Sequence, residues 1–202
     1  MKRLALCSCG VLVLYPAFGG RVLTSPMPYT LAVAVLPQGE YAPVVIKEMV
    51  REAASILKHS GLKIEWRLGA GNQVFEEPLA VVKLLGTCNM DLPGSPGKLG
   101  PLGWTHTADG DILPFSELAC DNIRNAIQSE LRAADRFSNA LLGRAMGRVL
   151  AHELFHIVAA TKEHTTAGVS QAGLSAAELL SNRLELDSAG VELIQDRLHG
   201  TR

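Results

Sequence analysis

Two histidines and a glutamate stand at a spacing that could bind a metal ion and use it. His152, Glu153 and His156 form the pattern His-Glu-x-x-His. Side chains four residues apart on a helix project from one face, so both imidazoles could ligate one tetrahedral zinc ion. The glutamate between them could then act as a general base on a water molecule. Such a short pattern also arises by chance, so its surroundings decide its weight.

The sequence around the pattern predicts a long, buried helix. Between residues 139 and 159, apolar side chains occur almost all round the helical projection. Unpaired histidine and glutamate are costly in such surroundings, and a metal bound by both imidazoles would remove that cost. Gly143 and Gly147 lower helix propensity and therefore predict close packing against another element. The alternative is a pair of hydrogen-bonded core histidines with Glu153 at the surface.

A catalytic zinc site needs a third protein ligand and an open position. We predict His164, because it lies just beyond the expected end of the helix, where a short turn would bring the chain back. The alternative for His164 is an exposed loop histidine. Glu178 is the rival ligand, although a capping box with Ser175 explains it structurally. Glu185 and Asp187 are weaker candidates.

Periodicity identifies the elements that precede this helix. Residues 31–36 form an apolar run typical of a buried strand, residues 43–57 have helical spacing, and residues 62–68 alternate like a strand. This order predicts a β-α-β unit with parallel strands. Residues 79–85 are a third strand.

A hairpin is expected next. Residues 104–107 and 112–115 resemble strands, and Asp109 and Gly110 between them favour a tight turn. His106 on this hairpin is expected to be a cleft-wall or surface residue, not a ligand.

The second half of the chain is helical in pattern. We predict helices over residues 121–137 (with interruptions), 139–159, 175–188 and 191–198. The expected fold class is therefore α/β (α+β). A mixed twisted sheet with an edge hairpin packs on the long buried helix, and the C-terminal part is helical.

Composition indicates a folded, nearly neutral chain. The 202 residues are 48% hydrophobic and 19% charged, with a formal net charge of -1. These values fit one domain with a core and exclude a disordered chain. The low charge gives no reason to expect nucleic acid or an anionic membrane as a partner.

The N-terminus has the pattern of an export signal. Lys2 and Arg3 precede an apolar stretch over residues 4–18, and small residues follow. We predict a signal peptide over residues 1–22 and a single domain over residues 23–202. The protein would be exported (periplasmic or secreted), with no stable membrane association after cleavage. An uncleaved anchor or a buried strand is the alternative.

Cysteine usage agrees with export. Cys7 and Cys9 would be removed with the signal, which leaves Cys88 and Cys120. Two cysteines in an exported protein predict one disulfide. Two unrelated buried thiols are the alternative.

The layout of strand, helix, strand, hairpin and long helix with the His152 to His156 pattern resembles the zinc metallopeptidases called metzincins. The resemblance covers about residues 30–165, and only the His-Glu-x-x-His part is specific to the motif. The continuation from His164 to Gly168 and Val169 is also similar to a group of small exported bacterial proteins of this general kind.

The chain departs from the metzincin pattern at three places. The third metzincin histidine follows the second by six residues, where this chain has Lys162. Ala159 stands where the turn glycine is usual, so His164 would need a longer turn. No methionine follows Met146, although metzincins carry one beneath the metal. The match is to a divergent relative, and substrate preferences are not carried over.

The resemblance implies a zinc-dependent peptidase acting on a peptide or protein substrate. His152, His156 and His164 would bind Zn²⁺, and Glu153 would be the general base. Residues 102–115 would include an edge strand that binds an extended peptide, and a Cys88–Cys120 link would tie the ends of this region together. One alternative is a catalytically inactive zinc-binding exported protein that binds a peptide or partner; another is an accidental motif.

Overall fold

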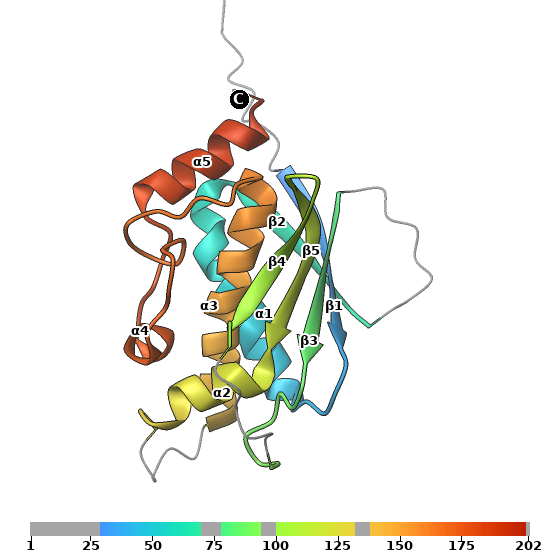
Figure 1. Ribbon diagram of the computed structural model, residues 1–202, viewed down its shortest axis with the longest axis vertical. Helices are drawn as coiled ribbons and strands as arrows, with labels where there is room; N and C mark the ends of the chain where they lie inside the picture. The colour runs from blue at the N-terminus through green and yellow to red at the C-terminus, as the bar shows by residue number, and fades with distance from the viewer. Residues whose placement is uncertain (1–28, 70–77, 94–99, 132–137, 201–202) are drawn as a thin grey trace, which may run out of the picture.

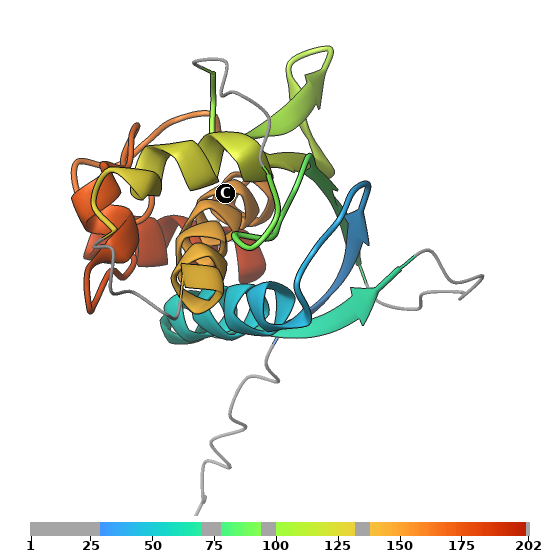
Figure 2. The same cartoon turned by 90° about the horizontal axis from the view of Figure 1, so that it is seen from below.

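The computed structural model describes residues 29–69, 78–93, 100–131 and 138–200. Its strands form one mixed sheet in the order β2-β1-β3-β5-β4. The helices lie on one face of this sheet (Figure 1, Figure 2). The expected fold class is confirmed. The strands are β1 (Tyr29–Pro37), β2 (Leu62–Leu68), β3 (Leu79–Leu85), β4 (Gly103–Ala108) and β5 (Asp111–Ala119). The helices are α1 (Pro43–Leu57), the 3-10 turn η1 (Lys58–Ser60), α2 (Cys120–Gln128), α3 (Ser138–Ala159), α4 (Ala176–Leu180) and α5 (Ser188–Leu198).

The predicted β-α-β unit is confirmed. Strands β1 and β2 are parallel and are joined through α1 and η1. Gly61, with φ of 84°, ends η1 in the left-handed region that glycine adopts without steric cost. Strand β3 pairs in parallel with the other side of β1, and β5 pairs in parallel with β3.

The predicted hairpin is confirmed and forms one edge of the sheet. Strand β4 pairs antiparallel with β5 and has no other neighbour among the described strands. Asp109 (φ 52°) and Gly110 (φ 97°) are both left-handed, as a two-residue type I′ turn requires. The register shifts between Thr105 and Thr107. Pro114 lies opposite, on β5, and has no N–H to donate to the ladder.

Helix α3 is the central packing element. It packs beside α1 on the same face of the sheet and contacts β4 and β5 (Figure 1), and most of its side chains from Leu142 to Val158 are buried. A Cβ atom at Gly143 would lie 2.7 Å from the Val45 carbonyl oxygen, and one at Gly147 would lie 2.7 Å from that of Met49. The two glycines therefore let α3 pack backbone to backbone on α1, as their positions predicted.

The prediction of one helix over residues 175–188 is wrong. Helix α4 ends at Leu180, and the chain from Ser181 to Asp187 is irregular. Ser181 leaves the helical region with ψ of 162°. At this point the Arg148 guanidinium of α3 donates to the carbonyl oxygens of Glu178 and Ser181 and to the Ser181 hydroxyl, and so holds the chain where α4 ends.

Arg148 itself is fully buried. Its Nε donates to Glu52 of α1 at 2.9 Å, and its side chain is 0% exposed against 14% for Glu52. Because a buried guanidinium requires partners, this residue fixes α1, α3 and α4 relative to one another.

The remaining helices follow the predictions in part. Helix α2 begins one residue before the predicted start and ends at Gln128, and residues 132–137 of the predicted segment lie outside the described residues. Helix α5 begins three residues before the predicted start at Val191 and ends at Leu198, as predicted.

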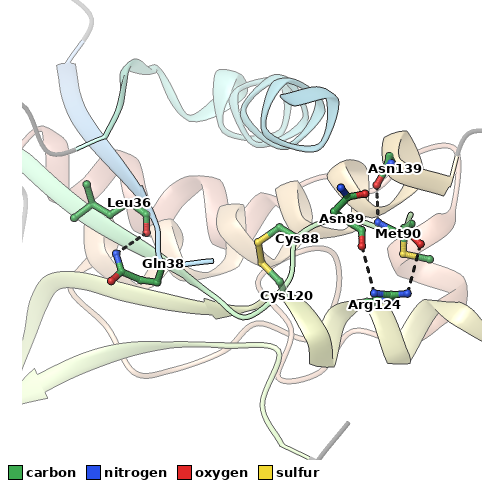
Figure 3. The surroundings of a disulfide bond; sticks show 8 residues. All are labelled: Leu36, Gln38, Cys88, Asn89, Met90, Cys120, Arg124 and Asn139. Carbon is green, nitrogen blue, oxygen red and sulfur yellow. Dashed lines mark hydrogen bonds between the residues drawn. A yellow bond between two sulfur atoms is a disulfide. The ribbon is translucent and has the colours of Figure 1, made fainter. Parts of the chain in front are cut away.

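Cys88 and Cys120 form the predicted disulfide, which joins the end of β3 to the start of α2 (Figure 3). Arg124 of α2 donates to the carbonyl oxygen of Leu92, and Asn139 of α3 accepts from the N–H of Met90. These contacts secure the chain that follows Cys88.

The predicted signal peptide lies outside the described residues, as do residues 94–99 between β3 and β4. Among the helices that the structure describes, none combines the length and apolarity needed to cross a membrane.

Candidate metal centre

Helix α3 holds two imidazoles at the spacing of metal ligands. The Nε2 atoms of His152 and His156 lie 3.1 Å apart. Ligating nitrogens in a tetrahedral zinc site lie about 3.3 Å apart, given Zn–N bonds of about 2.0–2.1 Å. The predicted helical register therefore brings these two side chains together.

Backbone carbonyls set the protonation of both rings. The Nδ1 of His152 lies 2.8 Å from the Val169 oxygen, and that of His156 lies 2.8 Å from the Thr161 oxygen. Because a carbonyl only accepts, each Nδ1 carries the proton and each neutral Nε2 presents a lone pair. Two lone pairs that face each other repel, and a shared cation removes the repulsion. The residues therefore fit a metal ion, with the carbonyl partners that metal-binding histidines require.

Burial keeps the helix histidines neutral in the metal-free protein. Desolvation lowers the pKa of His152 to about 4, and the hydrogen bond to Val169 opposes it only in part. Burial also lowers the pKa of His156. A neutral imidazole is the form that binds metal, so no proton must be removed near neutral pH.

A turn after α3 brings His164 to the helix pair. Ala160 adopts φ of 48°. Its N–H donates to the Ile157 carbonyl, and the Thr161 N–H donates to that of His156, which is the Schellman arrangement of a helix end. The Thr161 hydroxyl then accepts from the N–H of Glu163 at 3.0 Å. This turn lies one residue later than the metzincin glycine position, and one further residue separates it from His164, so the spacing is two residues longer in all.

The three predicted histidines form a potential metal site. Their ligand atoms all lie within 4.8 Å of one another. The His164 ring stacks on His152 with ring centroids 5.2 Å apart and stands edge-on to His156 at 4.8 Å. His164 is exposed, whereas His156 is buried, so the site opens toward solvent on the His164 side.

The segment after His164 is anchored to the chain before α5. The Val169 N–H donates to the backbone carbonyl oxygen of Glu185 at 2.9 Å, and the backbone carbonyl oxygen of Val169 faces His152. Gly168 has φ of 73°, and a Cβ atom there would lie 2.4 Å from the same Glu185 oxygen. Glycine at this position therefore allows the close approach that places the Val169 carbonyl.

Glu153 lies beside the histidines and is almost completely buried, with 4% of its surface exposed. Its Oε2 accepts a 2.7 Å hydrogen bond from the hydroxyl of Thr105 on β4. Burial raises the pKa of Glu153 to about 7, and the Thr105 bond opposes that shift. A cation bound by the nearby histidines would favour the carboxylate and lower this pKa.

Two adjoining cavities form a cleft on either side of Glu153. One, of about 410 Å³, contains the three histidines together with Lys162 and residues of β4. The other, of about 280 Å³, is lined mainly by apolar residues, including Leu102, Val149 and Leu174. The cleft therefore follows β4, the edge strand.

The other candidate ligands lie elsewhere. Glu178 forms the predicted capping box with Ser175, and its second oxygen accepts from Gln171 at 2.6 Å. Its hydrogen bonds to Ser175 hold the pKa of Glu178 below the usual value. Glu178 is thus engaged as a helix cap, and the three-histidine cluster does not include it. Glu185 pairs with Arg183.

His106 lines neither cavity of the cleft. Its ring packs on Phe115 with centroids 4.6 Å apart, and its Nε2 accepts from the Trp104 indole at 3.0 Å. Its side chain is 36% exposed, so the surface interpretation of this histidine is the correct one.

Four residues at the site were missed from the sequence. Thr105, Thr161 and Val169 contact Glu153, His156 and His152, respectively, and Ser116 lies behind Thr105. Thr161 and Val169 act through their backbone oxygens, which every residue type has, so the sequence does not reveal them. Only the alternation of the hairpin could have placed Thr105 on the face toward α3.

Comparison with known proteins shows that the fold of this chain is similar to that of a solved structure, although its sequence matches no family model. No protein-family model matches this chain, and no curated protein matches its sequence. The crystal structure of archaemetzincin from Methanopyrus kandleri is similar, with a TM-score of 0.53 and 12% sequence identity. The likeness covers 88% of this chain and 99% of that chain. At this identity it shows that the chain has an archaemetzincin-like fold, in agreement with the resemblance to metzincins.

Proposed function

We propose that this protein is a zinc-dependent peptidase. The observation that carries the proposal is a set of three histidines gathered beside a buried glutamate in an open cleft. His152, His156 and His164 are the zinc ligands. Three protein ligands leave a position for water or substrate, as catalytic zinc sites do. The archaemetzincin-like fold supports the same class of activity.

The chain's own residues divide the chemistry between them. Zinc, when bound, would polarise the scissile carbonyl and make a water molecule more acidic. Glu153 takes a proton from the attacking water and delivers it to the leaving amine. Its burial keeps competing water away, and the neutral imidazoles of His152 and His156 stay oriented by the carbonyls behind them.

Strand β4 provides a docking edge for the substrate. It lies at the edge of the sheet and lines the cleft through Gly103, Thr105 and Thr107. An extended peptide that adds to this edge would make main-chain hydrogen bonds, and its scissile bond would lie beside Glu153. The substrate is therefore a peptide or an extended segment of a protein.

The substitution Glu153→Gln tests the proposal. Glutamine keeps the shape of the side chain but cannot accept the proton. We expect stoichiometric zinc in both proteins by elemental analysis, and a loss of about 10²- to 10⁴-fold in cleavage of a randomised quenched-fluorescent peptide library. Undiminished cleavage by the variant would overturn the proposed role of Glu153.

The alternative is an inactive zinc protein that binds a peptide in the same cleft. A crystal structure of the zinc-loaded protein separates the two. Three histidine ligands with water at the fourth position support an enzyme, and a fourth protein ligand supports a structural site.

Export is part of the proposal. The predicted signal over residues 1–22 and the Cys88–Cys120 disulfide support an oxidising compartment outside the cytoplasm. Mass spectrometry of the mature protein from its native host tests this, because an intact Met1 in the secreted or periplasmic fraction would contradict cleavage.

A further inference from the structure

We propose that Thr105, supported by Ser116, is a positioning residue that fixes which oxygen of Glu153 accepts the proton. The inference rests on the proposed function for its catalytic meaning. It stands on contacts between the edge hairpin and α3 that the His-Glu-x-x-His motif does not contain.

Sheet register places the two hydroxyls. Thr105 of β4 and Ser116 of β5 are directly opposite each other, and their side-chain oxygens lie 2.8 Å apart. Directly opposed residues share one face of an antiparallel pair, and here that face meets α3. Ser116 is 0% exposed, so its hydroxyl is held away from bulk water. The shift in register begins just after Thr105, and such irregularities redirect side chains beside functional sites.

The hydrogen bonds have one consistent direction when Glu153 is ionised. The Thr105 hydroxyl lies 2.7 Å from Glu153 Oε2 and 3.2 Å from the Glu153 carbonyl oxygen. Both atoms only accept, and the shorter bond to the charged carboxylate takes the single hydroxyl proton. The Thr105 oxygen must then accept from Ser116 across their 2.8 Å contact. The chain of donors ends on Oε2, which leaves Oε1 as the atom that can take a proton from water.

The other oxygen has its own place in the structure. Glu153 Oε1 makes no hydrogen bond to any described residue, and it lies 2.9 Å from the position that a Cβ atom on Gly103 would occupy. Glu153 and Gly103 both line the two cavities of the cleft. The edge strand therefore holds one oxygen through Thr105 and leaves room for the other at Gly103.

A double-mutant cycle tests the contact without any need for activity. Urea unfolding of the metal-free protein at about pH 9, where Glu153 with its pKa of about 7 is ionised, compares Thr105→Val in the wild type and in a Glu153→Met background. We expect Thr105→Val to raise the unfolding equilibrium constant about tenfold or more in the wild type, because a hydrogen bond to a charged group is lost. The effect in Glu153→Met should be several-fold smaller. Equal effects in both backgrounds would overturn the inference.

Kinetics on the best-cleaved peptide of the library test the positioning. Thr105→Val should lower kcat by about 10- to 100-fold, with KM and zinc content unchanged. Thr105→Ser, which keeps the hydroxyl, should restore most of the rate. Ser60→Ala is the matched control, because it removes a buried hydroxyl that donates to Leu57 far from the cleft.

The outcomes separate the two proposals. An unchanged kcat in Thr105→Val, or no rescue by serine, would overturn the inference. If the wild type cleaves no peptide while the coupling is present, the peptidase proposal fails and the fixing of Glu153 by Thr105 stands.

Discussion

The two sides of the proposed metal centre are built differently. On one side, α3 supplies His152, Glu153 and His156 from a single buried helix packed closely on α1. On the other side, His164 and the Val169 carbonyl come from an irregular segment over residues 160–187, which contains only the short helix α4. Backbone and hydroxyl hydrogen bonds hold this segment, together with isolated bridges between Thr165 and Gln171 and between Gly168 and Leu186.

The geometry of the ligands reflects this difference. The two helix nitrogens already lie 3.1 Å apart, whereas all three ligand atoms fit only within 4.8 Å. A regular helix fixes ligand spacing by its repeat. A ligand on a loop must instead be fixed by many separate contacts. We therefore expect distant substitutions to change the position of the ligands mainly when they disturb the irregular segment.

The largest loss of stability is expected at Arg148, which joins α3 to the irregular segment. Arg148→Met leaves the Glu52 carboxylate and the Ser181 oxygens without their partner. Breaking a buried pair in this way costs about 3–5 kcal/mol, measured as the free energy of unfolding in urea. Limited proteolysis should also show faster cleavage within residues 160–187.

Arg144 provides the control for this substitution. It lies one turn earlier on α3 and is partly exposed. Arg144→Met should change the free energy of unfolding by about 0.5 kcal/mol or less. If both variants unfold alike, Arg148 does not join the two sides.

A smaller effect, on zinc affinity, is expected at Gly168 within the irregular segment. The methyl group of Gly168→Ala would meet the Glu185 oxygen and displace the Val169 carbonyl from His152. Loss of such a partner behind a ligand lowers metal affinity by about 10- to 100-fold, measured by competition with a zinc chelator.

Gly110→Ala is the control that separates backbone strain at a positive φ from displacement of the Val169 carbonyl. Gly110 also has a positive φ, of 97°, but nothing lies within 4 Å of its Cβ position. This variant should lose stability and keep its zinc affinity. A Gly168→Ala protein that binds zinc within twofold of the wild type would show that the segment does not position His152.

The same contrast explains what could be predicted from the sequence. Periodicity predicted β2, β3 and α1 to the residue, and the spacing of His152 and His156 predicted their shared face. The grouping of His164 with them, through a short turn after the helix, was also predicted. The prediction of one helix over residues 175–188 was wrong because the end of α4 is held by Arg148, 30 residues away from Glu178, and local periodicity does not report such a tertiary contact. Thr105 was missed because only the register of two strands places it beside Glu153.

The smallest change in stability is expected at the turn that joins α3 to the irregular segment. Ala160 adopts a left-handed conformation with φ of 48°, which costs a non-glycine residue about 1 kcal/mol. Ala160→Gly should therefore raise the free energy of unfolding by about 1 kcal/mol, measured in urea with a chelator present to exclude effects of metal. Ala159→Gly should lower it by a similar amount, because Ala159 is still helical. The opposite pattern would place the turn at the metzincin glycine position, and the longer route to His164 would then be wrong.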